Sequence, residues 1–145
     1  STASCLLEGT REAMEWRIGD RGFEMTLAES VPEIVRSRLG DWAREWLGRS
    51  GVGPDELEGI GWAIHPGGPR VLDAARDALG IPEACLSHSR AILRGHGNMS
   101  SPTVLFILDR ISGMTEAKRA VMLAFGPGLT SEAALLERVD RGCNG

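Results

Sequence analysis

The sequence has no tyrosine, three cysteines, three histidines and no long apolar run. Cys5, Cys85 and Cys143 are an odd number at no metal-ligand spacing, so we expect no metal site. No apolar segment reaches the roughly 18–20 residues that a membrane span needs, and no basic segment opens a signal peptide. The 16 Lys and Arg are scattered among 20 Asp and Glu, which argues against nucleic-acid binding. We therefore expect a cytoplasmic protein without nucleic-acid or membrane partners.

The chain of 145 residues is long enough for one domain and too short for two. Apolar residues make up 42% and charged residues 25%, which is ordinary for a globular protein and unlike a disordered chain. Glycine is abundant at 19 residues, many of them in short groups that separate the apolar segments and mark turns.

The spacing of apolar residues predicts alternating strands and helices. Strands are expected at residues 2–7, 23–27, 59–64, 119–126 and 129–139 (the last with a helical alternative), and helices at 30–47, 69–79, 83–93 and 102–111. Residues 8–21 indicate a loop or a strand-like excursion. Ser30 is expected to cap the first helix, Gly80 to end the second, and the last helix to be buried nearly all round. This order predicts an α/β domain with helices packed on a mixed sheet.

His65 directly follows the buried strand expected at residues 59–64 and precedes Gly67 and Gly68 in a turn into a helix. In α/β sheets, ligands bind beyond the carboxyl ends of strands. A histidine there can polarise a carbonyl or transfer a proton, and the glycine amides can meet an anion or a thioester oxygen. A structural histidine in a tight turn would give the same pattern.

Asn98 lies in a Gly-Asn-Met-Ser-Ser segment just before the apolar helix at residues 102–111. Asn and Ser are favoured in turns and at helix N-caps, so a capping role explains it. The alternative is an amide donor to a developing oxyanion. The turn at Phe125–Gly128 either shapes a pocket wall or joins two strands.

Three segments resemble motifs of the type III polyketide synthases, the chalcone synthase family. G-W-A-I-H-P-G-G-P-R-V-L-D (61–73) is similar to the histidine motif and G-H-G-N-M-S-S-P-T-V-L-F-I-L-D (95–109) to the asparagine motif. A-F-G-P-G-L-T (124–130) resembles the C-terminal glycine-rich loop. The three occur in the family's order, with His65 and Asn98 at the family's separation, and residues 2–60 follow the family more loosely.

The resemblance implies the C-terminal half of a thiolase-like fold, in which two similar halves form a five-layer α-β-α-β-α domain, and a homodimer. It implies decarboxylative Claisen condensation of an acyl-CoA starter with malonyl-CoA, with no cofactor beyond these coenzyme A thioesters. By the resemblance, His65 and Asn98 are catalytic and donate hydrogen bonds to the thioester carbonyl, while Gly67, Gly68 and Arg70 line the CoA entrance. The residues expected to shape the cavity are Phe125, Gly126, Pro127, Gly128, Met25 and Trp16.

The chain departs from the family in two respects. The family's nucleophilic cysteine belongs to the N-terminal half, so residues 1–145 are expected to be a fragment that is inactive alone and exposes an apolar patch. Trp16 and Met25 stand where plant enzymes have a small residue and an aromatic gatekeeper, so we transfer no flavonoid substrate. Two other hypotheses remain: a ketoacyl-ACP synthase III-like condensing enzyme, whose motifs usually read His-Gln-Ala-Asn and Gly-Asn-Thr-Ser, and a non-catalytic dimerisation or binding fragment.

Overall fold

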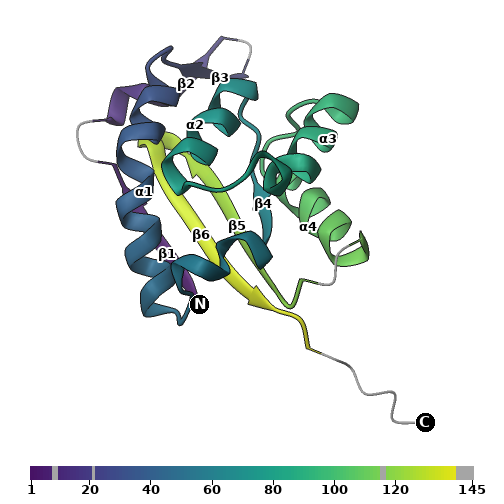
Figure 1. Ribbon diagram of the computed structural model, residues 1–145. Coiled ribbons are helices and arrows are strands. Elements are labelled where there is room, and N and C mark those ends of the chain that lie inside the picture. The colour runs from purple at the N-terminus through teal and green to yellow at the C-terminus, as the bar shows by residue number, and fades with distance from the viewer. Residues whose placement is uncertain (8–9, 21, 115–116, 140–145) are drawn as a thin grey trace.

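The computed structural model describes residues 1–7, 10–20, 22–114 and 117–139, and for Arg11, Trp16, Phe23 and Met114 it describes the backbone alone. The strands are β1 (Thr2–Leu6), β2 (Met14–Gly19), β3 (Gly22–Leu27), β4 (Gly61–Ile64), β5 (Arg119–Gly126) and β6 (Thr130–Glu137) (Figure 1). The helices are α1 (Val31–Arg49), α2 (Pro69–Leu79), α3 (Ser87–His96) and α4 (Pro102–Met114). Short 3₁₀ helices lie at Arg11–Ala13, Pro54–Gly59, Glu83–Leu86 and Pro127–Leu129.

Four strands form one mixed sheet in the order β1-β6-β5-β4, and β2 pairs with β3 in a separate hairpin. β4 runs parallel to β5, and the other neighbours are antiparallel. The predicted α/β class with a mixed sheet is therefore confirmed. Because β4 and β5 are parallel, their carboxyl ends lie at the same edge of the sheet, where His65 follows β4.

Helices cover the two faces of the sheet unequally. α1 and α2 lie side by side over one face, and α3 and α4 pack beside β4 (Figure 1). Trp62 and Ile64 of β4 belong to the larger apolar core beneath α1 and α2, whereas Ala63 belongs to a smaller core with α3 and α4. A strand with helices on both faces is apolar throughout, which explains the continuous run in β4.

Glycines allow close approach between elements at two places. A Cβ atom at Gly61 would lie 2.5 Å from Cγ2 of Ile111, so α4 packs directly against β4. A Cβ atom at Gly40 would overlap the carbonyl oxygen of Ala78, so α1 approaches α2 closely there.

The helix ends depart from the sequence predictions in two places. Ser30 makes no side-chain cap, because its own backbone is already helical (φ −75°, ψ −12°) and the Val31 N–H donates to the Ala28 carbonyl at 3.1 Å. The helix predicted at residues 83–93 is a 3₁₀ turn followed by α3. Gly80 ends α2 in the left-handed conformation (φ 68°, ψ 30°), as predicted.

The near-complete burial predicted for the last helix is wrong. Leu105 and Phe106 of α4 are 57% and 54% exposed, because the helix packs against β4 through one side only. Leu105, Leu108 and Leu136 line a groove of about 400 Å³ between α4, β5 and β6. Asp109, Lys118 and Arg138 also line this groove, and the apolar patch expected from the sequence stays a prediction. None of the described helices is both long and apolar enough to cross a membrane.

Candidate active site

His65 and Asn98 line the same cavity, of about 420 Å³, at the carboxyl ends of β4 and β5. Three further segments contribute to its wall: the β2–β3 hairpin, the start of α1 and the turn after β5. The lining residues are Met14, Met25, Leu27, Val31, His65, Gly67, Val71, Asn98, Ser100, Ser101, Val104, Ala124, Phe125, Gly126, Pro127 and Leu129. The cavity is therefore mainly apolar, with its few polar groups contributed by His65 and the loop before α4, as is usual for a ligand site.

The backbone of His65 is held by the sheet. Its N–H donates to the Leu123 carbonyl at 2.8 Å, and its carbonyl accepts from the Gly67 N–H at 3.1 Å. Burial lowers the pKa of the imidazole below its ordinary value of 6.5, so the ring is neutral at neutral pH. Nδ1 is buried and has no hydrogen-bond partner within the described part of the chain, so Nε2 is the ring nitrogen that a ligand can reach.

Asn98 is exposed in the loop that leads into α4. Its Oδ1 accepts the Ser100 N–H at 2.8 Å, an Asx turn that holds Ser100 at φ 62°. This bond occupies the side-chain oxygen and leaves the Nδ2 amide hydrogens available. The turn role and the donor role that the sequence left as alternatives are thus compatible, because they use different atoms.

Of the three predicted CoA-entrance residues, one lines the cavity. Gly67 lines it, whereas Gly68 and the exposed Arg70 do not. Gly68 is the N-cap of α2 with an extended backbone (φ 172°), and an added Cβ would meet nothing within 4 Å. Neither backbone strain nor crowding within the described residues therefore requires glycine at this position.

The predicted cavity wall is only partly the observed one. Phe125, Gly126, Pro127 and Met25 line the cavity, but Gly128 does not. Gly128 instead adopts a left-handed turn conformation (φ 71°) between β5 and β6, which glycine favours. Trp16 pairs with Met25 across the hairpin, and its side chain lies outside the described residues.

Several wall residues were missed by the sequence reasoning. Met14 pairs with Leu27 in the hairpin and lies two residues before Trp16 in β2. Residues two apart in a strand share a face, so this spacing could have identified Met14 as a wall residue. Val71 and Val104 come from α2 and α4, and only the packing of those helices brings them to the cavity.

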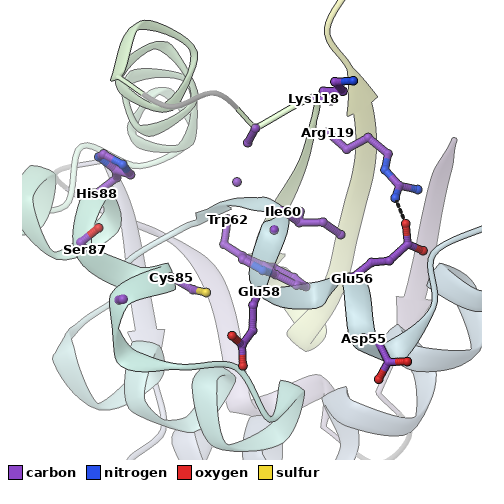
Figure 2. Close-up of a pocket in the computed structure, with 14 residues that line it drawn as sticks. Asp55, Glu56, Glu58, Ile60, Trp62, Cys85, Ser87, His88, Lys118 and Arg119 are labelled. Carbon is purple, nitrogen blue, oxygen red and sulfur yellow. Dashed lines mark hydrogen bonds and ion pairs between the residues drawn. The ribbon is translucent and has the colours of Figure 1, made fainter.

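A larger concavity, of about 720 Å³, lies at the opposite end of the sheet, where β4 and β5 begin (Figure 2). Its charges include an Arg119–Glu56 ion pair, and none of the predicted site residues is among the described residues that line it. Cys85 lies there, and burial together with the Glu58 charge raises the pKa of its thiol, which disfavours a reactive thiolate. Among the described residues, no group of three or more His, Cys, Asp or Glu is arranged to hold a metal ion.

The fold is that of a thiolase-like domain. The crystal structure of PKS-I from the brown alga Ectocarpus siliculosus superposes with a TM-score of 0.85 at 28% identity, covering 96% of this chain and 38% of that chain. Residues 1–140 match the model of the chalcone and stilbene synthases, C-terminal domain, so the chain belongs to this family.

Two relatives show the range of the similarity. The chain is 37% identical to 1,3,6,8-tetrahydroxynaphthalene synthase of Streptomyces peucetius subsp. caesius, over 94% of this chain and 36% of the relative. It is 32% identical to type III polyketide synthase 21 of Oryza sativa subsp. japonica, over 92% of this chain and 35% of the relative. The chain thus spans about a third of the length of these relatives.

Proposed function

We propose that the chain is the C-terminal part of a type III polyketide synthase that condenses an acyl-CoA starter with malonyl-CoA. The observation that carries the proposal is that His65 and Asn98 line one apolar cavity and each offers a neutral hydrogen-bond donor. Membership in this family favours acyl-CoA thioesters, rather than carrier-protein thioesters, as the substrates.

The proposed reaction needs hydrogen-bond donors at the oxygen where negative charge develops. When malonyl thioester loses CO₂, the electron pair of the broken carbon–carbon bond moves into an enolate, whose negative charge rests on the thioester oxygen. Donors aimed at that oxygen lower the barrier. The enolate carbon then attacks the carbonyl carbon of the starter thioester, a new carbon–carbon bond forms, and the carbon–sulfur bond breaks so that the starter's sulfur leaves as a thiolate.

Neutral donors suit this step better than charged acids. Burial lowers the pKa of His65, so the imidazole donates a hydrogen bond without readily protonating the carbanion. The Asn98 amide has no acidic proton in this pH range. Both residues can therefore stabilise the enolate without quenching it.

The remaining parts of the site are also proposals. The nucleophilic cysteine, which would hold the starter, would come from the N-terminal half of the same protein. That half would contact this chain at a surface that includes the exposed Leu105 and Phe106 of α4. Arg70, on the exposed first turn of α2, would meet a CoA phosphate as the thiol arm passes Gly67 and Gly68. The full protein would act in the cytoplasm as a homodimer without a further cofactor.

The test uses the full-length protein, malonyl-CoA and a series of acyl-CoA starters, with products identified by mass spectrometry. We expect malonyl-CoA consumption and polyketide products, both lost in His65→Ala and retained in His96→Ala, which changes an exposed histidine outside the cavity. Turnover with acyl-carrier-protein thioesters alone would favour a ketoacyl-ACP synthase III-like enzyme. No turnover with either class in folded protein would favour a non-catalytic unit.

A further inference from the structure

Two fully buried hydroxyl groups lie directly behind the candidate site. Ser89 on α3 and Thr103 on α4 are both 0% exposed. Each accepts a hydrogen bond from the main-chain N–H of a residue adjacent to His65 or Asn98. The same two helices contribute Ile92, Val104 and Ile107 to the smaller apolar core, so these two bonds account for hydroxyl groups that are buried on helices packed through apolar side chains.

Ser89 completes the hydrogen bonding of an edge strand. Within the described residues β4 pairs with β5 alone, and because the His65 N–H bonds to β5, the preceding Ile64 N–H points to the opposite edge of β4. Ile64 is 0% exposed, so water cannot satisfy that N–H. The Ser89 Oγ accepts it at 3.2 Å and fixes the peptide unit immediately before the imidazole.

Thr103 plays the corresponding part in the loop before α4. Its Oγ1 accepts the Met99 N–H at 2.9 Å, one residue beyond Asn98. The loop also holds Ser100 at φ 62°, a left-handed conformation that a residue other than glycine adopts only at an energetic cost. The Thr103 bond and the Asx turn of Asn98 together hold this loop shape.

We infer that Ser89 and Thr103 are positioning residues that fix His65 and Asn98 relative to each other. The helices that carry them pack against one another and against β4, so the two hydroxyls belong to one rigid unit. Donors to a developing oxyanion act only within about 0.5 Å of the productive geometry. This inference rests on the proposed function, because it assigns the pair to that reaction.

The test compares variants of the full-length protein that differ in one buried hydroxyl. Ser89→Ala removes the acceptor of the Ile64 N–H, and Ser131→Ala is its matched control, because Ser131 is also 0% exposed and its Oγ has no partner among the described residues. Thr103→Val removes the second hydroxyl at nearly constant volume, and Thr103→Ser keeps the hydroxyl.

We measure kcat and KM for malonyl-CoA decarboxylation, together with hydrogen exchange of peptides that cover residues 61–65 and 97–102. For Ser89→Ala and Thr103→Val we expect kcat to fall by roughly 10- to 100-fold with KM changed less than about 3-fold. Amide hydrogen exchange should be faster in the peptide covering residues 61–65 for Ser89→Ala and in the peptide covering residues 97–102 for Thr103→Val. Ser131→Ala and Thr103→Ser should keep kcat within about 3-fold of wild type.

Equal kcat values for Ser89→Ala and Ser131→Ala would overturn the inference, as would a loss confined to KM or an equal loss in Thr103→Ser and Thr103→Val. Wild-type protein without malonyl-CoA turnover would contradict the proposed function instead. In that case exchange decides: faster exchange at residues 61–65 in Ser89→Ala but not in Ser131→Ala supports positioning, and unchanged exchange overturns it.

Discussion

Replacing Gly61 with alanine would place a methyl group against Ile111, where α4 packs on β4. The new Cβ would lie 2.5 Å from Cγ2 of Ile111, closer than carbon atoms approach without displacement. Overpacking of this kind costs about 1–3 kcal/mol of folding free energy. The loss of glycine's freedom in the unfolded chain offsets about 0.4–1 kcal/mol of that cost. The contact lies on β4, the strand that leads to His65, so it also affects the site.

Gly59→Ala is the matched control, because a Cβ atom at Gly59 meets no described residue within 4 Å and its φ is not left-handed. Gly59→Ala reduces the freedom of the unfolded chain as Gly61→Ala does, but it introduces no clash. The difference in unfolding free energy between the two variants therefore measures the steric cost. Urea unfolding followed by circular dichroism should show Gly61→Ala less stable than Gly59→Ala by about 1–3 kcal/mol. In an Ile111→Ala background the difference should shrink. Equal stabilities would refute the close approach of α4 to β4.

Three further predictions concern the site and its surroundings. Gly68→Ala should leave the thermal midpoint within about 2 °C of wild type, since the position is open, but should raise KM for malonyl-CoA; an unchanged KM would remove Gly68 from the CoA path. Because burial lowers the pKa of His65, its neutral form stabilises the fold above pH 6.5, and this contribution is lost as pH falls through the lowered pKa. Thermal midpoints between pH 8 and 5 should therefore fall more steeply in wild type than in His65→Gln, and parallel curves would refute the lowered pKa. Burial and Glu58 raise the pKa of Cys85, so iodoacetamide should label it slowly at pH 7, and Cys85→Ala should retain activity; rapid labelling would show an activated thiolate.

Local signals in the sequence were sufficient where strong punctuation residues frame an element. Pro69 and Gly80 bound α2 at the predicted residues, because one is tolerated in the first helical turn and the other favours the left-handed stop. Ser30 failed as a cap because the preceding backbone already satisfies the first amide of α1. Apolar content alone likewise could not show that α4 buries only one side, since this depends on what packs against Leu105 and Phe106.

In the candidate site, too, some features follow from local sequence signals and others depend on packing. The motif residues His65 and Asn98 could be selected from sequence, and the structure places both at one cavity. Which other side chains form the wall depends on the approach of α2, α4 and the hairpin, so Val71 and Val104 carry no sequence signal of their role. The hydrogen bond of Ser89 to the edge of β4 is equally non-local, because it joins residues 25 positions apart.

The measurement that tests the account most directly is CO₂ release from malonyl-CoA by the full-length protein, in the absence of any starter. The account predicts that His65→Ala and Asn98→Ala each reduce kcat by roughly 10²- to 10³-fold, because each removes a donor to the enolate oxygen. The matched variant His96→Ala should release CO₂ at the wild-type rate. Wild-type rates in His65→Ala and Asn98→Ala would contradict the central claim that these two residues stabilise the enolate.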